Sequence, residues 1–195
     1  MSMDPSKLSV IARRLFANIE FDEDEKLICE IRKHYFGLVM IYISGFTVSV
    51  VLFIFLVLGS LFVQEDASVL ETNVSAIRVI MVLLGAVLTL LSIAMTLIGA
   101  YLYKGNVMLV TSEKIAQVLV RTIFDRKISQ LSIGDIQDVT VSQKGVLAHF
   151  FDYGTLVIET AGEQQNYTFS FTPKPYYYSK CIVGAHEENL KLYGN

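Results

Sequence analysis

The side chains that most often carry out chemistry are few in this chain and widely spaced. Its three histidines, His34, His149 and His186, fall in different segments, and none has the spacing of a zinc site. The sequence has no glycine-rich phosphate loop, no GxSxG and no HExxH motif. Asp135 and Asp138 lie close together, but carboxylates that cap a turn explain them more simply. We therefore expect a non-enzymatic protein with no catalytic residue, no metal ion and no cofactor.

The two cysteines, Cys29 and Cys181, have no CxxC or Cys/His spacing around them. Both fall in segments that are expected to lie in the cytoplasm, where thiols stay reduced. The sequence therefore predicts free thiols in place of a disulfide or a metal site.

Two long uncharged runs dominate the chain. Residues 35–63 and 79–103 contain no Asp, Glu, Lys, Arg or His, although 18% of the chain is charged. At about 1.5 Å per residue, each run covers a hydrocarbon core of roughly 30 Å. Apolar core helices of a soluble protein are the alternative, but they seldom exceed about 20 residues without a charge. The sequence predicts two transmembrane helices, at 35–63 and 79–103, joined by a short extracytoplasmic loop at 64–78.

The basic residues predict the orientation of these helices. Lys26, Arg32 and Lys33 lie just before the first run and five basic residues lie between residues 104 and 127, whereas the connecting loop contains only Arg78. Lys and Arg close to a membrane span favour the cytoplasmic side. We expect a multi-pass protein of the cell membrane with both termini in the cytoplasm.

Residues 1–34 are predicted to form a cytoplasmic helical segment. Residues 6–18 have an amphipathic pattern whose apolar face suits either the membrane or the cytoplasmic domain. The acidic run at 22–25 is interpreted as the solvated start of a helix, because acidic side chains favour a helix N-terminus. Residues 27–34 then lead into the first span.

Small residues recur at spacings of four, three, four and three along one face of the second run. They are Gly85, Thr89, Ser92, Thr96 and Gly99. Gly45 and Ser49 form a shorter counterpart in the first run. Helices approach closely along such faces, so these residues are a candidate packing face. An intramolecular hairpin is favoured, and a homo-oligomer is the competing interpretation.

The pattern changes to alternation with period two after residue 103. Tyr167, Phe169 and Phe171 share one face of a predicted strand. Similar segments, separated by turn residues, lie at 106–111, 114–122, 127–133, 136–142 and 154–160. A helix is predicted to start near Pro173 and Pro175. The fold class is a membrane α + β protein, with a cytoplasmic domain at 104–195 that is an antiparallel β-barrel or sandwich capped by a C-terminal helix.

Five short segments carry a further signal. They are RKHY at 32–35, YKGN at 103–106, VTSEKI at 110–115, IGDIQDV at 133–139 and YGTLVIETAG at 153–162. In this order the chain resembles bacterial PH-like membrane proteins of the YdbS type, over roughly residues 20–190. The resemblance implies a PH-like barrel of two sheets at the inner face of a prokaryotic membrane, with no catalytic residue.

PH domains that bind phosphoinositides cluster Lys and Arg around their first hairpin, whereas the corresponding turn here contains Glu113. The following loop combines Arg121, Arg126 and Lys127 with Phe124, which favours contact with a membrane surface and its anionic headgroups. The alternative is a hairpin turn whose charges are merely solvated and whose Phe124 belongs to the core.

The sequence thus predicts a membrane-anchored, non-enzymatic PH-like module that acts in binding or scaffolding at the cytoplasmic face of the membrane. One alternative is a module that senses anionic lipids, and another is a structural subunit of a larger membrane protein assembly. The expected partners are the lipid bilayer, anionic lipid headgroups, and a second copy of the chain or another membrane protein. Nucleic acid is not expected among them.

Overall fold

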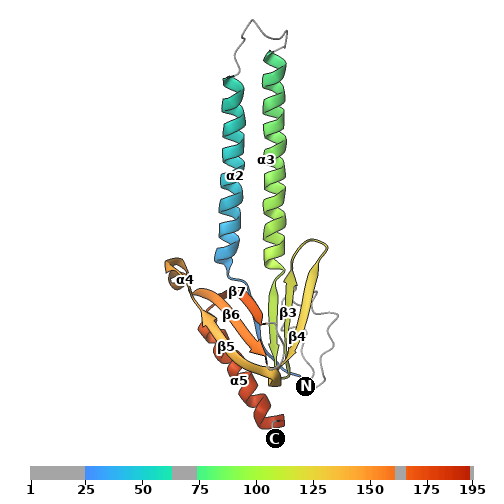
Figure 1. Cartoon of the computed structure of the whole chain (residues 1–195), viewed down its shortest axis with the longest axis vertical. Helices are drawn as coiled ribbons and strands as arrows, with labels where there is room; N and C mark the ends of the chain where they lie inside the picture. Colours follow the sequence, from blue (N-terminus) through green and yellow to red (C-terminus); the bar gives the residue numbers. More distant parts are fainter. Residues whose placement is uncertain (1–24, 63–73, 161–165, 194–195) are drawn as a thin grey trace. The chain divides into compact units, whose positions relative to one another are not determined.

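The structure, a computed structural model, describes residues 25–62, 74–160 and 166–193 (Figure 1). It divides into two compact units. The sheet unit contains the described residues up to Gly37 and those from Leu102 onward, and the helix pair contains the described residues from Leu38 to Tyr101. The amphipathic segment predicted at 6–18 lies outside the described residues, as do residues 22–24 of the acidic run.

Two long apolar helices follow the predicted runs. They are α2, Tyr35–Leu61, and α3, Val74–Lys104. Helix α3 begins before the span predicted at 79–103, so that Ser75 and Arg78 of the predicted loop are helical. α2 and α3 are the two helices of the described part of the chain that are long and apolar enough to cross a membrane. In each of them only 6% of the most apolar window is buried. The core helix of a soluble protein is mostly buried, whereas the most apolar windows of α2 and α3 are mostly exposed.

The sheet unit contains two antiparallel sheets. The first has the order β1-β2-β3-β4, with bounds Leu27–Arg32, Val107–Thr111, Lys114–Val120 and Arg126–Ser132. The second has the order β5-β6-β7, with bounds Ile136–Ser142, Tyr153–Thr160 and Tyr167–Pro173. Between the sheets in sequence lies a 3₁₀ turn, η2, Ile133–Asp135, and between β5 and β6 lies α4, Val146–Phe150. Helix α5, Pro175–Tyr193, ends the described chain (Figure 1).

The core of the sheet unit lies where the apolar faces of both sheets meet α5. Phe169, Leu156 and Ile158 come from the second sheet, and Met108 and Ile115 come from the first. Buried and half-buried residues alternate along β6, as expected for a strand with one face in a core. Ile182 and Ala185 of α5 belong to the same cluster, which explains why this helix covers it. The predicted order of two apolar helices, antiparallel sheets and a C-terminal helix is confirmed.

Residues 27–32 form a strand, which corrects the helical interpretation for this part of the segment predicted at 1–34. β1 pairs with β2 in the register Ile31↔Met108, and Ile31 is fully buried in the core. Leu27, Cys29 and Ile31 alternate with period two, a strand signal that the helical interpretation overlooked. The edge strand β1 of the first sheet therefore precedes the helix pair in sequence, whereas β2 to β4 follow it.

Candidate functional site

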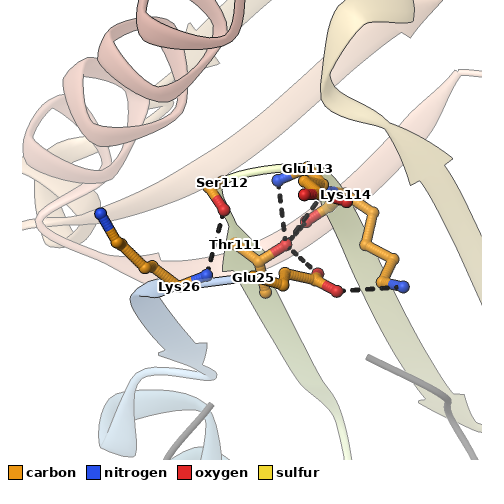
Figure 2. Close-up of polar contacts among 6 residues, drawn as sticks. All are labelled: Glu25, Lys26, Thr111, Ser112, Glu113 and Lys114. Atoms are coloured by element: carbon orange, nitrogen blue, oxygen red, sulfur yellow. Dashed lines mark hydrogen bonds and ion pairs between the residues drawn. The ribbon is translucent and has the colours of Figure 1, made fainter. Parts of the chain in front are cut away.

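Figure 2 shows the turn between β2 and β3, which is occupied by the residues just before β1. The buried carboxylate of Glu25 accepts a hydrogen bond from Thr111 Oγ1 and lies 3.1 Å from Lys114 Nζ. The backbone N–H of Lys26 donates to Ser112 Oγ at 3.0 Å. Glu25 is therefore not solvated, contrary to the interpretation of the acidic run. The lysine of this turn is paired within the protein, so the turn offers no basic cluster to a ligand.

The loop between β3 and β4 contains the predicted membrane-contact residues. Thr122 Oγ1 accepts hydrogen bonds from the backbone N–H groups of Phe124, at 3.3 Å, and Asp125, at 2.9 Å. This closed loop exposes 97% of Phe124 and 55% of Ile123. The alternative that Phe124 belongs to the core is wrong, because its side chain is almost fully exposed.

The basic residues of this loop are exposed beside Phe124. Arg121, Arg126 and Lys127 all lie on the surface, so the structure brings the four predicted residues together. The loop is anchored by Asn106, whose Oδ1 accepts from the backbone of Val120 at 2.9 Å. The amide of Asn106 in turn donates to Leu102 O at 2.9 Å. The loop thus emerges next to the point where the chain returns from the helix pair, and its contact with lipid stays a prediction.

The chain leaves the sheet unit toward α2 through residues 33–37, and His34 lies at the centre of their contacts. Its ring is buried, and its Nδ1 accepts a hydrogen bond from the backbone of Phe36 at 3.1 Å. Its backbone N–H donates to Phe171 O, and its carbonyl accepts from Tyr103 Oη at 2.7 Å. A Cβ atom on Gly37 would lie 2.1 Å from Tyr103 Oη, so a larger residue at this position would have to displace the Tyr103 ring. We call residues 33–37 the neck.

Burial changes the acid–base properties of two neck side chains. It lowers the pKa of His34, an effect that the nearby carboxylate of Asp152 opposes in part. It also lowers the pKa of Lys33, whose Nζ lies 3.5 Å from Ser170 Oγ and 5.2 Å from the centroid of the Tyr103 ring. Within the described ranges, Lys33 forms no ion pair.

Three non-glycine residues with positive φ surround the neck. They are Asp152 (φ 51°), Phe171 (φ 56°) and Lys174 (φ 42°), and the backbone N–H of Lys174 donates to Asp152 O at 2.8 Å. Each such residue costs about 1–2 kcal/mol unless its surroundings compensate, and such conformations cluster at turns and functional sites. The tertiary hydrogen bonds of the neck hold these residues in place.

A cavity of about 560 Å³ opens beside the neck. Its basic lining residues are Arg32, Lys33, His34 and Lys174. Arg32 Nε already lies 2.7 Å from the carboxylate of Glu30, so the ammonium groups of the two lysines are the main source of positive charge. The cavity is therefore suited chemically to an anion. Its one signal in the sequence is the basic and aromatic run at 32–35.

The predicted packing face of α3 lies against α2 within the helix pair. A Cβ atom on Gly45 would lie 2.0 Å from Thr96 Oγ1, and one on Gly85 would lie 3.1 Å from Leu56 Cβ. Ser49 Oγ lies 3.0 Å from Ser92 Oγ. A Cβ atom on Gly99 would be 3.7 Å from Ile41, and Thr89 lines a hollow between the two helices. Whether the same face also joins two copies of the chain stays a prediction.

The cysteines, far apart in sequence, are neighbours in the structure. Both are free thiols, Cys29 on β1 and Cys181 on α5. Burial, together with the adjacent Cys181 thiol, raises the pKa of Cys29 to about 12. A thiol that stays protonated is a poor nucleophile, so Cys29 is a packing residue and not a reactive one.

Two antiparallel sheets closed by a C-terminal helix define the sheet unit as a PH-like module. The family model described as "Bacterial PH domain" matches residues 38–177, well over half of the chain. The chain belongs to the bacterial PH domain family, as its resemblance predicted. The match includes both apolar helices and β2 to β7, but it leaves out β1.

A solved structure with similarity to this chain is a DUF1696 family protein with a pleckstrin-homology domain from Shewanella loihica PV-4. The two are 12% identical, with a TM-score of 0.34, over 42% of this chain and 70% of that one. A likeness of this size supports no conclusion about function. No curated protein matches the chain.

Proposed function

We propose that this protein is a membrane-anchored, non-enzymatic PH-like module that acts in binding or scaffolding at the cytoplasmic face of the cell membrane. The observation that carries the proposal is the outward apolar surface of α2 and α3. Phe55 and Leu90, for example, are 73% and 67% exposed. Soluble proteins rarely expose contiguous apolar patches beyond a few hundred Å², whereas a bilayer solvates such a surface.

The chain connections support a role at the membrane surface. Only Lys33 and His34 separate β1 from α2, and only Gly105 and Asn106 separate α3 from β2. Both connections are bonded within the sheet unit, His34 to Tyr103 and Asn106 to Val120. If α2 and α3 span the bilayer, the sheet unit is held next to it at two points.

Accessibility of introduced thiols in spheroplasts tests the topology. In a Cys29→Ala/Cys181→Ala background, a membrane-impermeant maleimide is expected to label Ser68→Cys, in the loop between the helices. The matched variant Lys144→Cys, in an exposed turn of the sheet unit, should be labelled only after permeabilisation. Labelling of Lys144→Cys in intact spheroplasts would overturn the orientation, which rests on the distribution of Lys and Arg.

Recognition of anionic lipid is a second candidate function, favoured by the exposure of Phe124 beside three cationic side chains. Phosphatidylglycerol added to the detergent-solubilised protein should raise its melting temperature. The increase should shrink with salt, which screens surface charge within about 10 Å at 0.1 M. It should also shrink in Arg126→Ala/Lys127→Ala. An equal increase in the wild type and in this variant would exclude the loop as the lipid site.

A further inference from the structure

Helix α4 presents apolar side chains to its surroundings, although it belongs to a folded sheet unit. Val146 is 84% exposed, Phe150 is 79% exposed and Leu147 is 51% exposed. Only Ala148 of this five-residue helix is buried. A helix this short is not stable by itself, so its packing on the sheet unit determines where these side chains point.

The contacts of α4 locate it beside the neck. The ring of Phe151, which directly follows α4, stacks on the ring of Phe36 with centroids 4.6 Å apart. Phe36 also stacks on Tyr153 at 5.1 Å. Since Phe36 belongs to the residues through which the chain leaves the sheet unit, α4 lies next to that passage.

The β3–β4 loop lies next to the return passage, through the contacts of Val120 with residues 105 and 106. Within the sheet unit, Figure 1 shows α4 and this loop at the end where residues 34–37 and 102–106 also lie. Two apolar protrusions thus flank the two points at which the chain passes to and from the helix pair.

We propose that α4 and the β3–β4 loop are two wedges that insert into the interfacial layer of an anionic bilayer. The wedge residues are Val146, Leu147 and Phe150 on α4, and Ile123 and Phe124 on the loop. This inference rests on the proposed function, because it requires that the chain enter the membrane at the neck. The wedges then hold one end of the sheet unit against the lipid and give this unit a defined orientation.

Position and charge identify a bilayer as the occupant of this surface. If α2 and α3 span the membrane, the end of the sheet unit that contains residues 34–37 and 102–106 lies at the level of the headgroups. Exposed basic residues adjoin both wedges, Lys144 before α4 and Arg121 and Arg126 around Phe124. Apolar side chains flanked by cations are typical of interfacial segments that bind anionic lipid. A fluid lipid surface accommodates two separate protrusions without matching their shape.

Tryptophan fluorescence tests the proposal, because the natural chain contains no Trp. Four single-Trp variants of the full chain are reconstituted in vesicles of phosphatidylethanolamine and phosphatidylglycerol, with and without brominated acyl chains. Phe150→Trp and Phe124→Trp report on the two wedges. Leu192→Trp, exposed near the far end of α5, is the matched control in water. Leu90→Trp, exposed in the middle of α3, reports on the hydrocarbon core.

Both wedge variants should show blue-shifted emission and at least about twofold quenching by bromine near the headgroups, as expected for side chains at the interface. Leu192→Trp should be unquenched, and Leu90→Trp should be quenched by bromine deep in the acyl chains. If either wedge variant behaves like Leu192→Trp while Leu90→Trp is quenched, the two-wedge proposal fails and the membrane anchor stands. A protein partner for α4 would give this result. An unquenched Leu90→Trp would overturn the proposed function itself.

Discussion

At the residue scale, His34 forms hydrogen bonds through both its backbone and its side chain. Its backbone N–H and C=O both form tertiary hydrogen bonds, to Phe171 and from Tyr103. Its ring nitrogen Nδ1 accepts from Phe36, so the folded neck requires an unprotonated Nδ1. Burial lowers the pKa of this imidazole below its ordinary value of 6.5, which agrees with the hydrogen bond.

The lowered pKa of His34 predicts that the protein loses stability in mild acid. Below about pH 6.5 the unfolded chain binds a proton at this histidine and the folded chain resists it, so the free energy of unfolding falls with pH. This stabilising contribution is present above about pH 6.5 and is lost as the pH falls through the lower, folded-state pKa. Melting temperatures in detergent across this range should therefore decline.

The variant His34→Asn separates this effect from general acid sensitivity. Its amide oxygen retains an acceptor for the Phe36 N–H but does not titrate, so its melting temperature should depend less on pH in this range. His149→Asn changes an exposed imidazole and should keep the wild-type dependence. Parallel pH curves for the wild type and His34→Asn would contradict the role assigned to the neck histidine.

At the element scale, α2 and α3 approach closely at a few small residues and are spaced more widely elsewhere. The tightest approach is between Gly45 and Thr96, where an added Cβ would overlap the threonine side chain. Thr96 is β-branched and its Oγ1 bonds to Ser92 O at 2.8 Å, so it has little freedom to move. At Gly99 the nearest atom would be 3.7 Å away, an ordinary van der Waals contact.

Gly45→Ala is therefore expected to destabilise the helix pair by about 1–3 kcal/mol, the usual cost of overpacking. Gly99→Ala, the matched control, should melt close to the wild type. Both changes add one methyl group and leave membrane insertion unaffected. The measurements are thermal unfolding in detergent and mass by light scattering. A change in mass for Gly45→Ala would show that the face joins subunits, and equal melting of both variants would show that this contact does not limit the packing.

At the scale of the whole molecule, the sheet unit is assembled from two sequence segments separated by the helix pair. β1 comes before α2, and the remaining strands follow α3. The first segment contributes Ile31 to the core and Glu25 to the β2–β3 turn. The domain predicted at 104–195 therefore lacks an edge strand of its own first sheet.

We predict that residues 25–37, joined to residues 102–195 by a short Gly/Ser linker, fold cooperatively in the absence of detergent. Residues 104–195 alone should be less stable by more than the roughly 2–5 kcal/mol that a buried Ile→Ala change costs, because they lose Ile31 and the β1–β2 hydrogen bonds. Circular dichroism melts compare the two proteins, and Ile31→Ala in the linked protein isolates the core contribution. Equal melting temperatures for the two proteins would show that β1 is dispensable.

Features that depend on residues close together in the chain were predictable from the sequence. An uncharged run of more than twenty residues predicts a long apolar helix at its own position, and the alternation in Tyr167, Phe169 and Phe171 predicts a strand. The small residues of α3 and the loop at 121–127 could be recognised for the same reason, since helical spacing and turn composition are local properties, but the sequence left open whether Phe124 is exposed.

Only the tertiary structure decided which distant segments meet. Glu25 is in an acidic run that is typical of a solvated segment, yet Thr111 and Lys114 bind its buried carboxylate. The alternating residues before α2 form an edge strand because they pair with β2, and no local pattern in the sequence indicates that partner. The apolar residues of α4 resemble core residues in sequence, and they are exposed because Ala148 alone packs inward. Residue periodicity determines the elements, whereas their partners and exposed faces depend on long-range packing.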